Sequence, residues 1–217
     1  AMLNAALKIV DQNPLGSAAG YGSSFPIDRT FTTKELGFET LKYNSVAAQM
    51  SRGKSEKTVA FAMSSVAATL AKFSMDVCLY MSQNFDFITL PSHLTTGSSI
   101  MPHKKNPDVF ELIRGKCNKI QALPYEITLI TNNLPSGYHR DLQLLKEGLF
   151  PAIQNLKACL DIALFSIKDI KVKEHILDDK KYDYLFTVDS LNEMVVAGMP
   201  FRDAYKAVAE QLENGTF

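Results

Sequence analysis

A long heptad stripe of apolar residues constrains the fold of this chain more than any other feature. From position 59 to position 80, apolar residues recur at alternating spacings of four and three, which places them along one side of a helix. The stripe consists of Val59, Met63, Val66, Leu70, Phe73, Val77 and Tyr80. A helix from about Ser55 to Gln83 would span about 45 Å at 1.5 Å per residue. The pattern predicts a long helix that packs along its neighbours at a shallow angle.

Two more long helices are predicted further along the chain. One begins at Asn106-Pro107-Asp108, because proline suits the first turn of a helix and an acidic residue there faces the positive end of the helix dipole. We expect Pro124 to kink or interrupt this helix, which then resumes to Ile130. The other helix runs from about Asp141 to Ile167, with a local bend at Pro151.

The remaining pattern completes an all-α interpretation. Two shorter helices are expected at Ser190–Ala197, ended by Gly198, and at Pro200–Leu212. No convincing strand hairpin or internal repeat is present. We therefore predict an all-α fold, with a partial long-helix bundle over residues 1–170 and the start of a small, truncated C-terminal helical domain over residues 171–217.

Composition excludes several classes of protein. The 217 residues carry 23 basic and 23 acidic side chains, and this zero net charge argues against a general nucleic-acid binder. No run approaches about 18 uninterrupted apolar residues, so no membrane-spanning segment is expected. The three cysteines, Cys78, Cys117 and Cys159, lie inside apolar helical patterns and lack the spacing of metal ligands. Buried, reduced thiols of this kind are typical of a cytoplasmic protein.

Three polar segments interrupt the helical pattern. The first, residues 14–24, is rich in glycine and by itself indicates only a loop. The second, Thr95–Pro107, is a Gly-Ser loop that leads into a helix and carries lysines and an asparagine. Such groups can bind a carboxylate or phosphate, although an ordinary flexible surface loop would have a similar composition. The third, Ser136–Glu147, opens the last long helix. Gln143 and Lys146 lie three residues apart there, so they are expected to share a helix face, although a merely solvated helix start is the alternative.

The second segment is long enough to be specific. Residues 97–107, Gly-Ser-Ser-Ile-Met-Pro-His-Lys-Lys-Asn-Pro, resemble the GSSxMPxKxNP signature of the fumarase/aspartase superfamily. Within that superfamily, further stretches resemble the argininosuccinate lyases, and the resemblance covers essentially the whole chain. These stretches are residues 14–20 with 26–29, residues 112–116, residues 138–147 and residues 198–205.

The resemblance implies a reaction, the reversible β-elimination of argininosuccinate to arginine and fumarate, without a metal or organic cofactor. A base removes a proton next to a carboxylate, and preorganised positive charge stabilises the resulting dianion. The resemblance places the base at Ser98, with Ser99 as the rival hydroxyl. Lys104 and Asn106 would stabilise the carboxylate, and closure of the loop would exclude water.

Other residues receive roles from the same resemblance. Glu111 would orient or tune a catalytic histidine, and Tyr138, Gln143 and Lys146 would hold the other end of the substrate. None of the four histidines, His93, His103, His139 and His175, lies in the Thr-His segment that the family uses. Arg52 aligns with a family arginine but lacks its acidic neighbours in sequence, which leaves a substrate or interface role doubtful.

The length implies a portion of a larger enzyme. Family members are roughly twice as long, so the chain is expected to be a middle-to-C-terminal portion that lacks two earlier active-site regions and is inactive alone. The family's homotetramer takes residues from three subunits at each site, which predicts a homo-oligomer. Two alternatives stay open: a related lyase acting on adenylosuccinate or fumarate, and a non-catalytic structural protein of the same fold.

Overall fold

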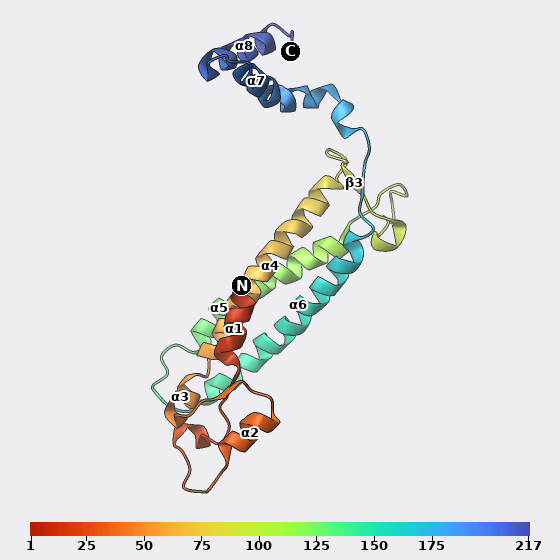
Figure 1. Cartoon of the computed structure of the whole chain (residues 1–217). Helices are drawn as coiled ribbons and strands as arrows, with labels where there is room; N and C mark the ends of the chain where they lie inside the picture. The colour runs from red at the N-terminus through yellow and green to blue at the C-terminus, as the bar shows by residue number, and fades with distance from the viewer. The chain divides into compact units, whose positions relative to one another are not determined.

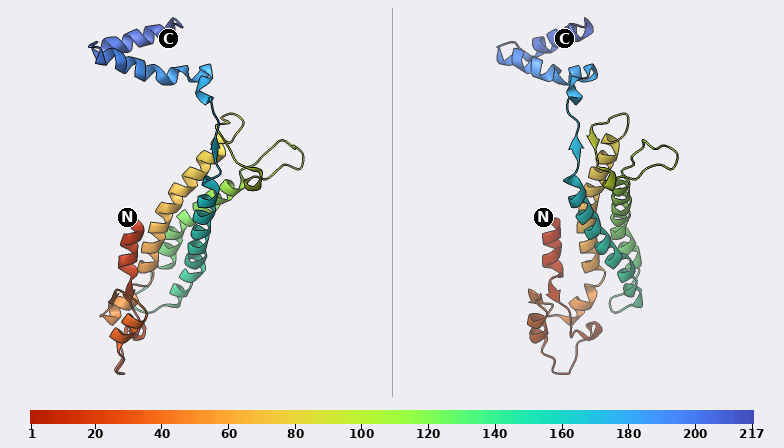
Figure 2. Two further views of the ribbon diagram at one scale, coloured as in Figure 1. Left: turned by 45° about the vertical axis from the view of Figure 1, so that its right-hand side comes forward. Right: turned by 90° about the vertical axis from the view of Figure 1, so that its right-hand side faces the viewer.

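Three long helices form the centre of the larger of two compact units. The computed structural model describes residues 1–217, and these divide into Ala1–Lys171 and Val172–Phe217. The long helices are α4 (Lys54–Tyr80), α5 (Asp108–Ile130) and α6 (Leu145–Ile167), which lie side by side in Figures 1 and 2. The only strands are two residues long, so the predicted all-α class is confirmed. The interpretation of the two units as parts of separate domains stays a prediction.

The first predicted helix begins and ends through local hydrogen bonds. Gly53 precedes α4 with a φ of 78°, and its backbone N–H donates to the Glu56 carboxylate at 2.7 Å. This bond is the half of a capping box that a glycine can make, and it satisfies a backbone N–H group at the start of the helix. At the other end, the Ser82 hydroxyl donates to the Leu79 carbonyl at 2.6 Å, and the chain turns there. The helix therefore stops at Tyr80, three residues before the predicted end.

Pro124 does not interrupt α5, because the helix continues through this residue, so that part of the expectation is wrong; the alternative, a kink at Pro124, stays a prediction. Pro124 is buried, and so are its helical neighbours Leu123 and Ile127. The Thr128 hydroxyl donates to the Pro124 carbonyl at 2.7 Å. Helix stability in a folded protein comes mainly from packing of the apolar face, and here that packing outweighs the hydrogen bond that proline cannot make. The third helix likewise continues through Pro151.

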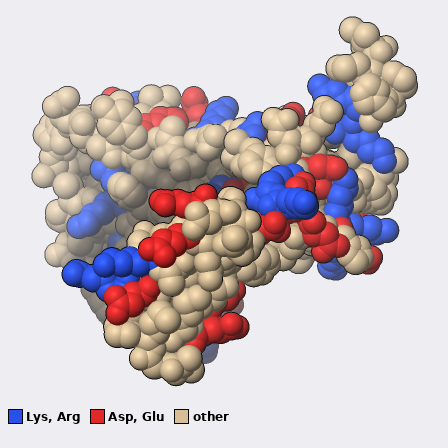
Figure 3. Space-filling view, turned by 90° about the horizontal axis from the view of Figure 1, so that it is seen from above, with Lys and Arg blue, Asp and Glu red and all other residues tan.

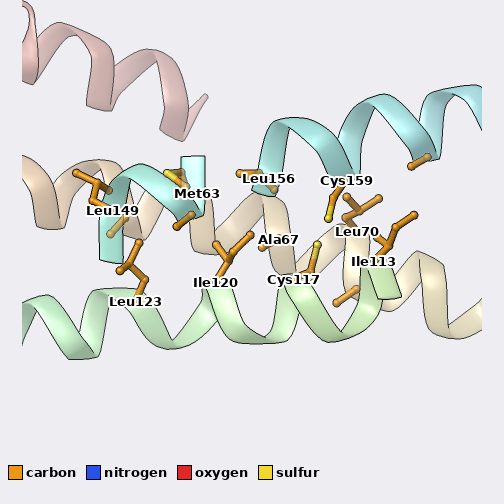
Figure 4. Close-up of a cluster of buried hydrophobic side chains, with 14 of the residues drawn as sticks. Met63, Ala67, Leu70, Ile113, Cys117, Ile120, Leu123, Leu149, Leu156 and Cys159 are labelled. Carbon is orange, nitrogen blue, oxygen red and sulfur yellow. The ribbon is translucent and has the colours of Figure 1, made fainter. Parts of the chain in front are cut away.

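The core lies between the three long helices, as Figure 4 shows. Most of the predicted stripe on α4 is buried or half-buried, but Tyr80 is exposed and makes an edge contact with the Phe85 ring and a tilted contact with the Phe87 ring. Small residues allow close approach: a Cβ added to Gly148 on α6 would lie 3.0 Å from Leu123 on α5. Buried residues from the three helices include Ala60, Met63, Ala67, Leu70, Phe110, Ile113, Ile120, Leu145, Leu149 and Leu156.

The segment before α4 contains several short elements. It begins with α1 (Met2–Val10), which packs on α4, and continues with β1 (Gln12–Asn13), α2 (Arg29–Glu35), β2 (Thr40–Leu41) and α3 (Ser45–Met50). The two strands pair in parallel. Arg29 holds the segment together, because its guanidinium donates to the carbonyls of Leu15, Lys42 and Tyr43 at 2.8, 2.7 and 3.0 Å.

The smaller unit contains two helices, both predicted. The helix α7 (Thr187–Val196) ends before Gly198, which has a φ of 102°, a left-handed conformation that glycine adopts without strain. The helix α8 (Phe201–Glu213) packs against it through a small core of Leu191, Ala204 and Val208. Two 3-10 helices, Ile176–Asp178 and Lys180–Phe186, precede α7, and β4 (Lys171–Val172) lies where the units join. The strand β3 (Ile88–Thr89) belongs to the larger unit.

Two helical stretches resemble membrane-spanning segments in length and composition, although no such segment was expected from the sequence. Lys54–Tyr80 and Arg140–Ile167 are each long and apolar enough to cross a membrane by length and composition alone. Both contribute to the core, and a core helix passes the same test, so this is weak support for a membrane span. Only 33% and 28% of their most apolar windows are buried within the chain. On the face shown in Figure 3, acidic and basic side chains are intermixed among a large neutral surface.

Candidate active site

The Gly-Ser loop is closed at its base by the residues that flank it. Thr96 and Asn106 pair through their backbones, with N···O distances of 3.1 and 2.8 Å. The Asn106 side-chain amide donates to the carbonyls of Thr96 and Gly97 at 3.3 and 3.4 Å. The Thr96 hydroxyl donates to the Asp108 carboxylate in the first turn of α5. These bonds hold the base of the loop at the start of α5, and the rest of the loop projects from it (Figure 2).

Within the loop, Ser98 has an environment suited to a negatively charged oxygen. Its Oγ accepts hydrogen bonds from the backbone N–H groups of Ile100 and Met101, at 3.2 and 3.1 Å. Donors aimed at an oxygen stabilise charge on it, as in an oxyanion hole. Ser99 is an exposed residue at the next position. The geometry thus favours Ser98 over its rival as the group that could carry an alkoxide.

The other loop residues are arranged less directly for chemistry. Lys104 is exposed, and its backbone N–H donates to the Met101 carbonyl at 3.0 Å. The amide hydrogens of Asn106 are used within the loop, so a role in substrate binding requires the loop to rearrange. Glu111 is exposed in the first turn of α5, and no hydrogen bond or ion pair joins its side chain to His103 of the loop. The predicted roles of Lys104, Asn106 and Glu111 stay predictions.

The second group of predicted residues lies on the connection between α5 and α6. Tyr138 is exposed, Gln143 is half-buried in a 3-10 helix (Arg140–Gln143), and Lys146 is exposed in the first turn of α6. The expectation that Gln143 and Lys146 share a helix face stays a prediction, because a 3-10 helix passes into α6 between them. The helical geometry changes between them, because Leu144 N–H donates to the Asp141 carbonyl in the tighter pattern of a 3-10 turn.

Arg52 fixes this connection, a role that the sequence argument missed. Its Nη2 donates to the Leu142 carbonyl at 2.9 Å, and its Nε pairs with the Glu56 carboxylate at 2.9 Å. The acidic partner that seemed absent beside Arg52 stands one helical turn later, at the i,i+4 spacing that brings side chains together. His139 adds a bond between its Nε2 and the Pro135 carbonyl at 2.8 Å. Arg52 thus acts on the backbone that carries Gln143.

The two groups of predicted site residues stand at opposite ends of α5. Ser98, Lys104 and Asn106 precede its first residue, whereas Tyr138 and Lys146 follow its last (Figure 1). A helix of 23 residues is roughly 34 Å long at 1.5 Å per residue. One small substrate cannot contact both groups within a single chain. The structure therefore assembles each group separately and does not bring them together.

The histidines and acidic residues form no further centre. His93 lies 3.7 Å from the Asp169 carboxylate, His175 lies 2.9 Å from that of Asp178, and His103 is exposed on the loop. No group of three or more His, Cys, Asp or Glu side chains is positioned to hold a metal ion. The expectation that the chemistry needs no metal or organic cofactor stays a prediction.

Comparison with known proteins defines the class to which this arrangement belongs. A family model described as "Lyase" matches residues 1–122, more than half of the chain. The chain therefore belongs to this lyase family. Among its curated relatives, the argininosuccinate lyase of Parabacteroides distasonis is 61% identical over 216 residues, which are 100% of this chain and 48% of that protein.

Other relatives agree in name and in coverage. The argininosuccinate lyase of Bacteroides fragilis strain YCH46 is 59% identical over 215 residues (99% of this chain, 48% of the relative), and that of Xanthomonas campestris is 42% identical over 206 residues (95% and 48%). The chain spans about half the length of these curated relatives. The resemblance to argininosuccinate lyases drawn from the loop and its companion stretches is thus confirmed.

Solved structures support the fold. A class II fumarase from Schistosoma mansoni superimposes with a TM-score of 0.80 at 17% identity, covering 99% of this chain and 49% of that one. An EDDS lyase in complex with formate superimposes with a TM-score of 0.79 at 21% identity, covering 98% and 43%. These likenesses confirm the predicted long-helix bundle as a fold.

Proposed function

We propose that this chain is a portion of an argininosuccinate lyase, in which Ser98 removes the proton from argininosuccinate. The single observation that carries the proposal is the pair of backbone N–H groups on Ser98 Oγ, within a loop that matches the superfamily signature. A hydroxyl becomes a useful base only where its alkoxide is stabilised. Two N–H donors, with Lys104 on the same loop, supply that stabilisation. The products would be arginine and fumarate.

The roles of the remaining residues follow from charge. The elimination passes through a state with extra negative charge on a substrate carboxylate, which cationic and amide groups stabilise. Lys104 and Asn106 would serve this carboxylate after the loop closes and the Asn106 amide leaves the carbonyls of Thr96 and Gly97. Glu111 would orient a histidine from another part of the enzyme. Tyr138, Gln143 and Lys146 would hold the far end of a substrate in a different site.

The separation of the two groups along α5 supports a homo-oligomer, and we propose a tetramer. Since one chain cannot bring both groups to one substrate, copies must meet so that the loop end of one lies against the α5–α6 connection of another. The long helices also expose apolar side chains that a neighbouring chain could cover. Those more than half exposed include Phe61, Leu112, Leu129, Phe150, Leu164 and Phe165. Such surface is typical of interaction sites. We propose that the assembly acts in arginine biosynthesis in the cytoplasm.

The proposal is tested with the bare chain and with a chimera. The chain alone, mixed with argininosuccinate, should release no fumarate above background, because the groups that would complete the site are absent. A chimera that carries residues 1–217 in place of the matching half of the Parabacteroides distasonis enzyme should release fumarate. In it, Ser98→Ala should abolish most of kcat and leave KM nearly unchanged, whereas Ser99→Ala should retain activity.

Two alternatives have distinct outcomes in the same chimera. A preference for adenylosuccinate or for hydration of fumarate in a substrate panel would assign a different lyase activity. An inactive chimera that still assembles would favour a structural role for the chain. Robust turnover by the bare chain would contradict the incomplete site proposed here.

A further inference from the structure

A cationic cleft lies beside α3 and the start of α4, next to the α5–α6 connection. Its volume is about 480 Å³, and its walls come from α3, the first turns of α4, the end of α5 and the α5–α6 connection. Arg52, Lys54, Lys57 and His139 line it, and none of the lining residues is acidic. Tyr138, Gln143 and Lys146 do not line it. The chain has zero net charge, so this concentration of positive charge is local.

The wall of the cleft also contains a buried polar group that has no hydrogen-bond partner within the chain. Gln49 is 9% exposed and lines the cleft, and its amide Nε2 is buried without a hydrogen-bond acceptor. Buried polar groups are nearly always paired in folded proteins. An unpaired N–H donor beside a cationic cavity calls for an acceptor, and the acceptor that suits the surrounding charge is an anionic oxygen.

The cations in the cleft are only partly neutralised by their neighbours. Glu56 is the acidic residue near Arg52, and it already accepts from Arg52 Nε and from the Gly53 backbone N–H. The backbone of Leu142 occupies Arg52 Nη2. Lys42 also lies in this field: burial lowers its pKa, Glu56 acts in the opposite direction, and the charge of Lys54 lowers it again. Lys54 and Lys57 form no ion pair within the chain, so their side chains are free to meet a ligand.

A second cavity on the same bundle provides a contrast. It lies between α5 and α6 and contains Lys116 and Lys119, but Glu126 and Glu147 also line it. Its charges therefore balance, and it has no need of an external anion. The difference in acidic residues separates the two cavities more clearly than their size does.

We propose that the cleft lined by Gln49, Arg52, Lys54, Lys57 and His139 is a binding site for a small dianion whose charge is carried by oxygen atoms. Phosphate and short dicarboxylates share this chemistry. The ligand's oxygens would accept from Gln49 Nε2 and from the two lysines. Because Arg52 also holds the backbone of Leu142, occupancy would act on the connection that carries Gln143. The proposal is independent of the lyase activity, since it concerns binding to the chain as it exists.

The test is a titration of the ¹⁵N-labelled chain by NMR, with inorganic phosphate in one arm and succinate in the other, at ionic strength held constant with sodium chloride. Saturable shifts should appear at the amides of Arg52, Lys54 and Thr131, which line the cleft. Shifts confined to residues 97–106 would instead place the anion on the signature loop and overturn the proposal. Binding in both arms, or in either arm alone, supports it and identifies the shape of the anion.

Matched variants locate the binding. Lys54→Gln with Lys57→Gln should weaken binding by about tenfold or more, whereas Lys72→Gln, an exposed lysine on the same helix, should change it by less than about twofold. Gln49→Leu removes the amide donor without changing the charge and should also weaken binding. Shifts that follow ionic strength without saturation, or equal effects of the lysine variants at positions 54/57 and 72, would overturn the proposal.

Discussion

The thiols of Cys117 on α5 and Cys159 on α6 face one another in the middle of the core, as Figure 4 shows. The two residues are 0% and 2% exposed. Each helix presents a small, polarisable side chain at this point, so the two helices pack closely without leaving a void. The pair is structural. The expectation of buried thiols holds for these two cysteines, whereas Cys78 is half-buried.

The environment of Cys117 predicts a loss of stability at high pH. Burial, then the neighbouring Cys159 thiol, raises the pKa of Cys117 from 9.0 to about 12. The folded state therefore holds a proton that the unfolded state releases. This contribution is fully present below about pH 9 and is lost as pH rises toward about 12, with a slope of up to about 1.4 kcal/mol per pH unit. Urea unfolding between pH 8 and pH 11 should show a smaller slope for Cys117→Ala than for the unaltered chain. Equal slopes would contradict the burial of an un-ionised thiol.

A single methyl group added at Gly53 is expected to have a large effect on the stability of the chain. Its φ is 78°, and an added Cβ would lie 2.4 Å from Thr131 Cγ2, so both the backbone and the packing oppose a side chain. Gly53→Ala should lower the free energy of unfolding by at least about 1–3 kcal/mol. Gly115→Ala is the matched control, since Gly115 is an exposed position within α5 with nothing near its added Cβ. That control should stabilise the chain by up to about 1 kcal/mol. Thermal unfolding of both variants distinguishes the two signs.

Thr96 and Asp108 predict how the signature loop is anchored. The bond from the Thr96 hydroxyl to the Asp108 carboxylate joins the loop base to the first turn of α5. Thr96→Val keeps the shape of the side chain and removes this donor. The backbone amides of Thr96 and Asn106 should then exchange with deuterium about tenfold faster, because a hydrogen bond to a charged group is worth roughly 1.5–3 kcal/mol. Thr95→Val removes only a 3.4 Å bond to the Ser92 carbonyl and serves as the control. Unchanged exchange in Thr96→Val would show that the backbone pairing of Thr96 and Asn106 alone holds the base of the loop.

The spacing of apolar residues in the sequence predicted most of the fold, for a physical reason. The stripe from Val59 to Val77 must be buried on one face of a helix, so spacing alone predicts α4. The short elements before α4 depend on distant contacts, such as Arg29 donating to the carbonyls of Lys42 and Tyr43, which leave no periodic trace in the sequence. Propensity also misjudged Pro124, because tertiary burial decides whether a helix tolerates proline.

The candidate site was predicted in its residue types and only partly in its geometry. A signature of eleven residues identifies Ser98 and its neighbours, but no pattern in one chain shows which hydroxyl receives two backbone N–H groups. Nor does the sequence place Ser98 and Lys146 at opposite ends of one helix. That relationship follows from the length of α5 and from the turn that joins it to α6, and it changes what a single chain can do.

The opposite placement of Ser98 and Lys146 predicts that two inactive chains can complement each other. In the chimeric enzyme described above, Ser98→Ala and Lys146→Ala should each lower kcat/KM by about 100-fold or more, since each removes a group on which the reaction depends. If each site takes the loop end from one copy and the connection end from another, mixed oligomers will contain some sites with neither substitution. Unfolding and refolding the two variants together should therefore restore measurable fumarate release, whereas refolding each alone should not. A double variant carrying both substitutions, refolded with an equal amount of either single variant, controls for non-specific recovery, because no site in that mixture can escape substitution. Failure of the two single variants to complement, with oligomers confirmed to have mixed, would mean that both groups act within one chain and would contradict the separation along α5.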